Sequence, residues 1–381
     1  MTKKKWVGAL FNFFVPGLGI VYSQNIRKGV LTYILFFLAV FSFRFFVYSF
    51  GLFLFAMTLI LGAYVYLIIS GYRSIEKDKV YEPKSLDKWY VYTLIFVLQV
   101  AFLESIKGQP LDKISPINFA STPTPSMDPG LRVGDMFAYK KTKSIERYDA
   151  TVFWFPDDMQ TMYIKRCIGL AGDSLRISNA KVFINGAALP DIPLKFRYMV
   201  SMDGSKIHPK ILEKMHIGQD DYYAFSSDSS LFFLTEQQAK ELKEVPSIKK
   251  VERYIETEGE VRHKVYPNSE THKWNLDFYG PLYIPKKGDK IQLTDENITL
   301  YLKCIEFENE SVEWDNIGLT INGQEHETYT FKTNYYFMMG DNRHNSLDSR
   351  SWGLLPEELV KGKALYLIWS ETRDRIGEEV R

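Results

Sequence analysis

Hydrophobic and polar positions divide the chain into two parts with different patterns. Up to about residue 105 the sequence contains long uncharged apolar runs, whereas the remainder alternates between apolar and polar residues over short runs. A run of about 20 apolar residues is long enough for a helix to cross the hydrocarbon core of a bilayer. Short alternating runs are typical of β-strands that bury one face. We therefore expect a helical membrane region, residues 1–105, followed by a mainly β domain.

Three apolar runs predict membrane-spanning helices. Residues 45–72 carry no charged side chain, and residues 29–44 carry one only at Arg44, whose long side chain can reach the membrane surface. The run at 88–105 is shorter, so it crosses a bilayer only if the charged residues near its ends lie at the two interfaces. A buried core helix is the alternative for each short run, but three such runs so close together favour membrane spans.

An earlier apolar run, residues 6–26, is interrupted by Pro16, Gly17 and Gly19. Such an interruption is compatible with a re-entrant hairpin, an interfacial segment or a poor span. The three lysines at 3–5 resemble the start of a signal peptide, but no small-residue cleavage site follows the apolar stretch. We therefore expect this segment to be retained.

Basic residues between the apolar runs predict how the chain is oriented. The loop after the second run carries four of them, Arg73, Lys77, Lys79 and Lys84. Short loops rich in Lys and Arg remain in the cytoplasm. The last predicted span then leads outwards, so we expect everything after about residue 105 to be extracytoplasmic.

Short runs rich in Val, Ile, Tyr and Phe predict the strands of the second part, because Gly, Pro, Asn or Asp bound each of them. These runs lie at residues 135–141, 150–155, 161–170, 174–186, 328–331 and 335–340. The pairs Asn185-Gly186 and Asn322-Gly323 are strong signals for β-hairpins. An antiparallel, mainly β domain is the resulting prediction.

A charged stretch of mixed pattern, residues 191–319, lies between the two groups of predicted strands. It contains a helix-like segment at 236–245. We interpret it as a large insertion that separates two halves of a β core, residues 106–190 and 320–372.

Composition excludes several classes of function. The chain has 381 residues with 47 Lys and Arg against 46 Asp and Glu, a net charge of +1. A balance of this kind argues against binding of nucleic acid, which leaves a strongly basic footprint. Cys167 and Cys304 are too few for a cysteine-rich zinc site, and they either pair or stay free. The six histidines show no metal-ligand spacing, so we expect neither metal nor cofactor.

Two segments contain candidate catalytic side chains. Ser126 lies among prolines in segment 122–135, which favours a rigid extended loop. Lys165 lies in the apolar, strand-like segment 163–173. A serine in such a loop is more often a turn residue, and a strand lysine more often points outwards. If Lys165 is buried instead, desolvation lowers its pKa and makes it a possible general base.

A third segment, GDNRHNSLDSRSWG at 340–353, is rich in Asp, Asn and Ser. A calcium-binding loop is the competing interpretation. It fails because the loop requires Gly at position 6 and Glu at position 12, where this chain has Ser346 and Trp352.

Together the segments PSMDP at 125–129, YIKRCIGLAGD at 163–173 and GDNRHNSLDSRSWG resemble bacterial type I signal peptidases, and the last resembles members from Bacteroidetes. The resemblance covers about residues 85–175 and 320–370, and RYDATVFWFP at 147–156 adds to it. It implies a membrane-bound serine endopeptidase of the inner (plasma) membrane with a periplasmic β catalytic domain. Such an enzyme removes signal peptides from exported preproteins after small residues at −1 and −3. Its partners are these preproteins and the lipid bilayer, and oligomeric state is not implied.

The resemblance also implies roles for individual residues. Ser126 matches the nucleophile and Lys165 the general base, a pair that needs no histidine. The oxyanion hole would be formed by the Ser126 N–H and the hydroxyl of Thr124, where some relatives carry serine. Ser346 would orient the lysine.

Two further groups follow from the same match. Asp348 and Arg350 are implied to form a supporting ion pair beneath the site. Asp341 and Arg343 are implied to belong to the loop that holds this pair. Shallow pockets for small substrate side chains are implied for Met127, Tyr163 and Ile164.

Other interpretations are weaker. His344 lies near Asp348 and suggests a Ser-His-Asp arrangement, but we favour an exposed or supporting role for it. The match of residues 247–250 to S-x-x-K is a chance hit, since no companion K-T-G follows. A self-cleaving Ser-Lys regulator would need a DNA-binding domain. An inactive membrane-tethered binding module would be free to lose either Ser126 or Lys165, and both are present.

Overall fold

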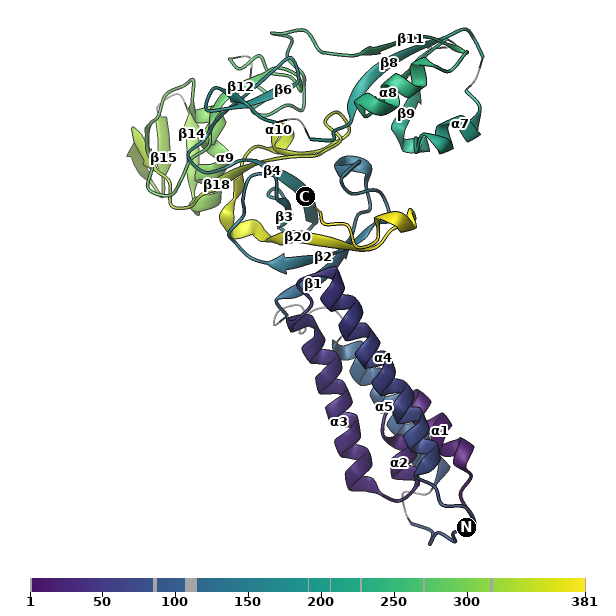
Figure 1. Ribbon diagram of the computed structural model, residues 1–381. Coiled ribbons are helices and arrows are strands. Elements are labelled where there is room, and N and C mark those ends of the chain that lie inside the picture. Colours follow the sequence, from purple (N-terminus) through teal and green to yellow (C-terminus); the bar gives the residue numbers. More distant parts are fainter. Residues whose placement is uncertain are drawn as a thin grey trace. The chain divides into compact units, whose positions relative to one another are not determined.

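The computed structural model describes residues 2–84, 88–106, 115–190, 192–205, 207–226, 228–269, 271–315 and 318–380. The chain forms two compact units, Met1–Phe119 and Ala120–Arg381 (Figure 1). The first is helical and the second is mainly β, as the sequence pattern predicted. Each unit is described separately below.

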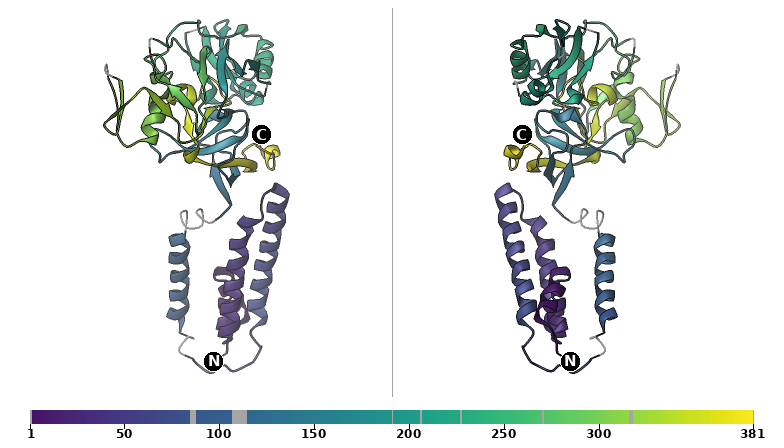
Figure 2. Two further views of the ribbon diagram at one scale, coloured as in Figure 1. Left: turned by 90° about the vertical axis from the view of Figure 1, so that its left-hand side faces the viewer. Right: turned by 90° about the vertical axis from the view of Figure 1, so that its right-hand side faces the viewer.

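The first unit consists of helices that follow the predicted apolar runs. They are α1 (Lys5–Phe14), α2 (Leu18–Tyr22), α3 (Ile26–Ser42), the 3₁₀ helix η1 (Phe43–Phe45), α4 (Phe50–Arg73) and α5 (Trp89–Ile106). Two stretches, Ile26–Phe45 and Phe50–Arg73, are long and apolar enough to cross a membrane. The third predicted span is a shorter apolar helix, Trp89–Glu104. Helices α3 and α4 lie side by side in both views (Figures 1 and 2).

The predicted interruption of the first apolar run is a break between α1 and α2. Pro16 lacks an N–H, and Gly17 takes a φ of +88° that other residues rarely adopt. A Cβ atom on Gly17 would also collide with the carbonyl oxygen of Gly29. The side chain of Asn12 ties the break to α4, since its Nδ2 donates to the Leu67 carbonyl at 2.5 Å. Whether the segment is re-entrant stays a prediction.

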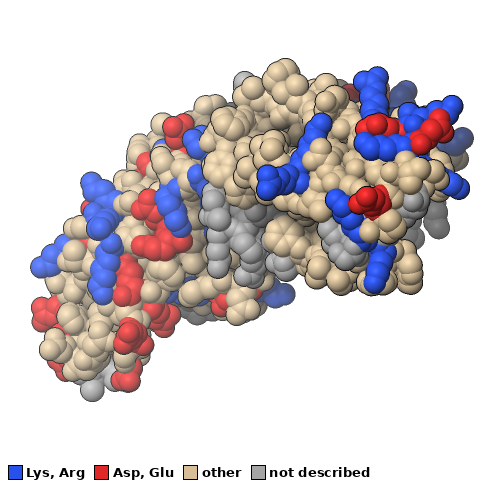
Figure 3. All heavy atoms as spheres, turned by 90° about the horizontal axis from the view of Figure 1, so that it is seen from below, with Lys and Arg blue, Asp and Glu red and all other residues tan. Residues whose placement is uncertain are grey.

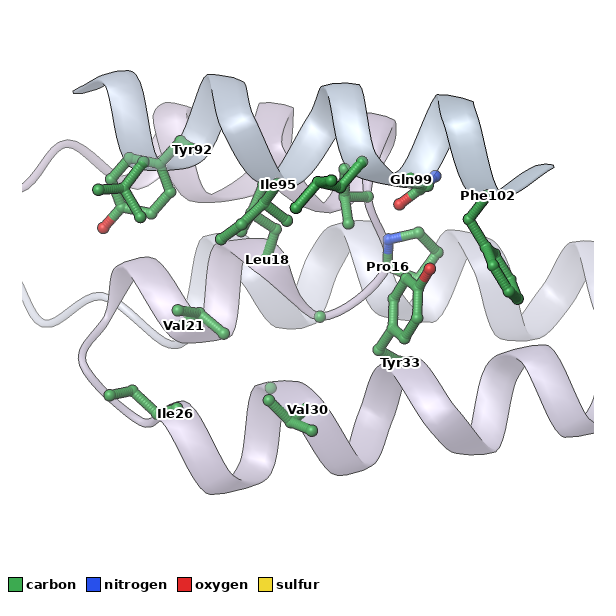
Figure 4. A pocket seen from close by; sticks show the side chains of 15 residues that line it. Pro16, Leu18, Val21, Ile26, Val30, Tyr33, Tyr92, Ile95, Gln99 and Phe102 are labelled. Atoms are coloured by element: carbon green, nitrogen blue, oxygen red, sulfur yellow. The ribbon is translucent and has the colours of Figure 1, made fainter. Parts of the chain in front are cut away.

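The surfaces of these helices are apolar, both outside and within the bundle. Leu31, Leu35 and Leu38 of α3 are more than half exposed, which suits contact with lipid. A cavity of about 400 Å³ lies between the α1–α2 break, α3 and α5. Figure 4 shows side chains such as Leu18 and Ile95 facing it from two of these segments.

The second unit is built on a seven-stranded sheet. Its strand order is β1-β2-β20-β3-β4-β18-β19. The strands are β1 (Ile117–Ser121), β2 (Met136–Lys141), β3 (Ala150–Trp154), β4 (Met162–Gly169), β18 (Tyr335–Met339), β19 (Leu355–Pro356) and β20 (Val360–Trp369). Strands β2 and β3 pair with β20, and β4 pairs with β18, so segments from the two ends of the second unit share one sheet.

A second sheet, of order β12-β5-β6-β7, lies next in the chain. It contains β5 (Ser174–Ser178), β6 (Lys181–Ile184), β7 (Ala187–Ala188) and β12 (Tyr279–Tyr283). The predicted hairpin joins β6 to β7, and Asn185 and Gly186 both have positive φ. The second Asn-Gly pair likewise joins β15 (Gly318–Ile321) to β16 (Gln324–His326).

Residues 196–253 form a small subdomain, here called the outer subdomain. A sheet of order β11-β8-β10-β9 packs with two short helices around an apolar core of its own. Its elements are β8 (Phe196–Met202), α7 (Pro209–Lys214), the 3₁₀ helix η4 (Gln219–Asp221), β9 (Tyr222–Ala224), β10 (Ser229–Leu234), α8 (Glu236–Lys243) and β11 (Ile248–Arg253). The helix expected at 236–245 is confirmed as α8, whose start is capped by Thr235.

The rest of the predicted insertion belongs with the core. It comprises β13 (Lys290–Gln292), α9 (Ile298–Glu308) and β14 (Val312–Asp315), followed by β17 (Thr328–Thr330). Leu282 of β12 and Ile298 and Ile305 of α9 share an apolar cluster with Phe337 of β18. Residues 191–319 are thus not one inserted body, because their second half completes the apolar core beside β18.

On the face that Figure 3 shows, basic and acidic side chains are interspersed, with wide uncharged areas between them. Both cysteines are buried free thiols, so Cys167 and Cys304 do not pair. Burial raises the pKa of each thiol, which makes them inert structural residues.

Candidate active site

A cavity of about 920 Å³ opens on the second unit between three segments. They are the loop 122–135 between β1 and β2, here called the nucleophile loop because it carries the expected nucleophile Ser126, then β4, and the loop after β18. Ser126 and Lys165 both line the cavity, together with Tyr163, Ile164 and Ser346. The structure thereby brings together residues from three separate segments that the sequence analysis singled out.

Ser126 lies in a single 3₁₀ turn, η3 (Pro125–Met127), between β1 and β2. Proline at the first position of the turn has the φ that the turn requires and lacks only a donor that would be unsatisfied there. The Ser126 carbonyl accepts a hydrogen bond from the Asn342 N–H at 3.1 Å. Gly340 permits this approach, because a Cβ atom there would collide with the Ser126 carbonyl oxygen and with Ser346 Oγ.

Lys165 approaches the serine from β4, in the middle of the seven-stranded sheet. Its Nζ lies 2.7 Å from Ser126 Oγ and donates to the Ile164 carbonyl at 2.9 Å. Only 4% of the residue is exposed. Burial lowers the pKa of Lys165 to about 8, although Asp348 and Asp341 oppose this shift. A large fraction of the amine is therefore neutral near pH 8 and able to accept the serine proton.

Thr124 lies beside Ser126. Its Oγ1 is 3.1 Å from Ser126 Oγ, and the residue is exposed to the cavity. The oxyanion-hole role expected for the Ser126 N–H and the Thr124 hydroxyl stays a prediction.

An ion pair lies beneath the site, between Asp348 and Arg350. Arg350 Nε and Nη2 donate to the two Asp348 carboxylate oxygens at 3.0 and 2.8 Å, and both side chains are buried. Asp348 also accepts from the Gly340 N–H at 3.0 Å and caps the short helix α10 (Ser349–Trp352). Burial alone would raise the pKa of Asp348, but Arg350 outweighs it and the pKa is lowered. The carboxylate is held by Arg350 and makes no ion pair with Lys165.

The expected supporting loop contains a second buried ion pair. Asp341 of this loop binds Arg166, whose Nε and Nη2 donate to its carboxylate oxygens at 2.7 and 2.5 Å. The sequence analysis missed Arg166. The available signal was a second basic residue directly after Lys165 in an apolar strand, since a buried guanidinium needs a carboxylate partner. Arg343 instead contributes its backbone to the loop, and burial lowers its pKa to about 10.

Two further expectations concern Ser346 and Met127. Among the described residues no hydrogen bond joins Ser346 Oγ to Lys165; the Ser346 side chain instead helps Arg350 to lower the pKa of the Asp348 carboxyl. The orienting role of Ser346 stays a prediction. Met127 is fully buried in the core beneath β2 and does not line the cavity, because the 3₁₀ turn directs it inwards while Ser126 faces out. Phe137 and Val152 line the cavity in addition to Tyr163 and Ile164.

His344 is engaged away from the serine. Its Nε2 lies 2.8 Å from Asp277 Oδ1, and its Nδ1 accepts from the Arg197 N–H at 3.2 Å. The side chain is 1% exposed, and burial lowers its pKa. The Ser-His-Asp interpretation is therefore wrong, and so is an exposed position. The supporting role holds, since both ring nitrogens brace the loop that carries Asp341 and Arg343.

Comparison with known proteins gives consistent matches. The family model described as signal peptidase, peptidase S26 matches residues 89–240 and 284–369. Signal peptidase I of Buchnera aphidicola subsp. Acyrthosiphon pisum (strain APS) is 24% identical over 312 residues, 77% of this chain and 76% of the relative. Signal peptidase I of B. aphidicola subsp. Baizongia pistaciae (strain Bp) is 25% identical over 282 residues, 67% of this chain and 70% of the relative. A 36-residue segment is 58% identical to signal peptidase I of Aquifex aeolicus (strain VF5), covering 9% and 14% of the two chains.

Proposed function

Because this chain belongs to the signal peptidase family, peptidase S26, we propose that Ser126 and Lys165 are the residues with which it cleaves. The protein is a serine peptidase that removes signal peptides. The observation that carries the residue assignment is the 2.7 Å contact between Lys165 Nζ and Ser126 Oγ. A buried amine whose pKa is lowered to about 8 suits a general base.

The geometry supports a two-step acyl transfer. Lys165 takes the hydroxyl proton as Ser126 Oγ forms a bond to the scissile carbonyl carbon. The resulting oxyanion is positioned to receive hydrogen bonds from the Ser126 N–H and the Thr124 hydroxyl. When the C–N bond breaks, Lys165 gives the proton to the leaving amine of the product. The neutral Lys165 then takes a proton from a water molecule, which attacks the acyl carbon and releases the acyl group from Ser126 Oγ.

Replacement of each member of the pair tests this assignment. We expect Ser126→Ala and Lys165→Met each to lower the rate of preprotein cleavage by about 1000-fold or more, because no other described base lies against the serine. Lys165→Met keeps the volume of a buried apolar stem, so the unfolding midpoint should stay near that of the parent. Lys181→Met, an exposed change on β6, is the matched control. Near-normal turnover in Lys165→Met would contradict the proposal.

We further propose that the enzyme cleaves after small residues at −1 and −3. The cavity wall supports this, because the Tyr163 ring stacks on Phe155 with centroids 4.6 Å apart and cannot turn aside easily. A bulky −1 side chain would displace the scissile carbonyl, and a small displacement can cost about 100-fold in rate. Phe in place of Ala at −1 should therefore cut cleavage by about that factor, while Phe well inside the mature sequence should not. Equal rates for both preproteins would refute the specificity.

The two long apolar helices support anchoring in a membrane, and we propose a multi-pass protein of the inner membrane with a periplasmic catalytic unit. Its partners are then the lipid bilayer and preproteins that carry signal peptides. The basic residues between α4 and α5 favour this orientation.

A further inference from the structure

Lys195 is a buried lysine that the catalytic scheme leaves without a function. It precedes β8 at the entrance of the outer subdomain, and only 1% of it is exposed. A lysine is almost never this deeply buried unless it is paired. Its partners therefore indicate what it does.

The side chain of Lys195 joins two segments that are distant in the sequence. Its Nζ donates to Asp128 Oδ2 at 2.6 Å and to Asp221 Oδ1 at 2.7 Å. Asp128 lies two residues after Ser126, in the turn that presents the nucleophile, and Asp221 ends η4 of the outer subdomain. One ammonium group thus connects the nucleophile loop to that subdomain.

The backbone of Lys195 joins a third segment. Its N–H donates to the Asp341 carbonyl at 3.0 Å, and its carbonyl accepts from the Arg343 N–H at 2.9 Å. These two bonds form a parallel bridge opposite Asn342, and the Asn342 N–H in turn donates to the Ser126 carbonyl at 3.1 Å. Lys195 therefore reaches the nucleophile turn by two routes, through Asp128 and through the 341–343 loop.

The charges at this junction favour a tight arrangement. Asp128 and Asp221 are both largely buried and share one cation. Burial raises the pKa of Asp128, and Lys195 opposes that rise. Without the lysine, two carboxylates would face each other in a poorly solvated site, so the turn that holds Asp128 would be pushed out of place.

We propose that Lys195 is a positioning residue for the reaction, which fixes the turn carrying Ser126 and makes the outer subdomain part of the catalytic apparatus. This inference rests on the proposed role of Ser126. Lys195 touches neither the cavity nor the reacting atoms, so its loss should lower kcat and leave KM nearly unchanged. The ~100-fold cost of a small misplacement sets the scale, and we expect kcat to fall about 10- to 100-fold.

The experiment measures kcat and KM for preprotein cleavage by the full-length protein in detergent. Lys195→Met removes the ammonium and keeps the buried stem, whereas Lys195→Arg restores a cation and should recover part of kcat. Lys210→Met, an exposed change in α7 of the same subdomain, is the matched control and should match the parent. Unfolding midpoints are recorded for every variant.

Double variants separate positioning from simple destabilisation. Asp128→Ala should lower kcat to a similar extent, and Lys195→Met with Asp128→Ala should be no worse than Lys195→Met alone, because both remove one connection. Should Lys195→Met fail to fold, Asp128→Ala retains the Lys195–Asp221 pair and still tests the connection. If the double variant Lys195→Met with Asp221→Ala recovers the parental kcat, the fall in kcat of Lys195→Met was caused by an unpaired Asp221 carboxylate. That result overturns the positioning role of Lys195.

Parallel assays of Ser126→Ala and Lys165→Met distinguish this inference from the proposed function. Suppose that those two variants lose activity while Lys195→Met keeps the parental kcat, or changes only KM. Either result overturns the positioning role of Lys195 and leaves the proposed Ser126–Lys165 pair intact. Activity in Ser126→Ala overturns the nucleophile and the positioning role together.

Discussion

At the scale of single residues, the proposed mechanism depends on keeping the Lys165 amine unprotonated. Lys165 is buried at the centre of a sheet, and the two nearest carboxylates are each bound by an arginine. Were either carboxylate free to pair with the amine, the pKa of Lys165 would rise towards its usual value and the base would be lost. The arginines at 166 and 350 therefore act on the reaction by occupying Asp341 and Asp348.

A pH dependence follows from this arrangement. In the proposed mechanism the neutral form of Lys165 is the active base, so kcat/KM should rise with pH and level off above about 8, the lowered pKa of the amine. Below that value the rate should fall about tenfold per pH unit as the amine becomes protonated. Initial cleavage rates measured at low substrate between pH 6 and 9.5 check this.

A histidine control accompanies the profile. His344→Gln should leave the midpoint of the rising limb in place, because burial lowers the pKa of His344 away from 8. If the rising limb of the pH profile disappears or shifts in His344→Gln, the titrating group is His344 and not Lys165.

At the scale of elements, the loop and short helix after β18 form the base of the site. Asp348 caps α10 and binds Arg350, while the preceding loop reaches the nucleophile turn through Asn342. The same segment thus supports its own backbone and holds η3. Its many polar residues are explained by the number of donors and acceptors that a buried loop has to satisfy.

Removal of one partner from the buried ion pair should destabilise the second unit. Arg350→Met leaves the Asp348 carboxylate buried without a cation, which typically costs about 3–5 kcal/mol in the free energy of unfolding. Denaturant unfolding followed by tryptophan fluorescence measures the change. Lys250→Ala breaks the exposed pair with Glu252 and should cost no more than about 1 kcal/mol.

The sign of the pH effect on stability provides a further check on the same pair. The folded pKa of Asp348 is lowered, so the pair contributes fully above the ordinary Asp pKa of about 4 and its contribution is lost as pH falls through the lowered folded value. The gap between parent and Arg350→Met should therefore narrow on acidification. A gap that stays constant down to pH 2 would show that the pair is not the cause.

At the scale of the whole molecule, the helical unit and the catalytic unit have different environments. The exposed apolar faces of α3, α4 and α5 suit lipid, whereas the catalytic unit buries its apolar side chains in several cores. A peptidase that acts on exported preproteins needs its catalytic unit outside the cytoplasm, so the orientation of the helices is part of the function.

Reporter fusions test that orientation. A reporter enzyme that works only outside the cytoplasm should be active when it is fused near residue 200. It should be inactive when it is fused near residue 80, in the basic segment between α4 and α5. The opposite pattern would place the catalytic unit in the cytoplasm and make the export function untenable. A reporter active only in the cytoplasm should show the inverse result at both positions.

The sequence alone determined the features that depend on local pattern or on a short motif. Uncharged runs predicted α3 and α4, and alternating runs with two Asn-Gly pairs predicted most strands and hairpins. These predictions succeed because hydrophobic period and turn chemistry act over a few residues. Three segments singled out Ser126 and Lys165, which the fold brings to a separation of 2.7 Å and whose catalytic roles are our proposal. Only the tertiary structure decided the partners of buried charges, such as Arg166 for Asp341 and Lys195 for Asp128, and the inward direction of Met127. Pairing of that kind depends on which distant segments the fold brings together, and no local pattern encodes it.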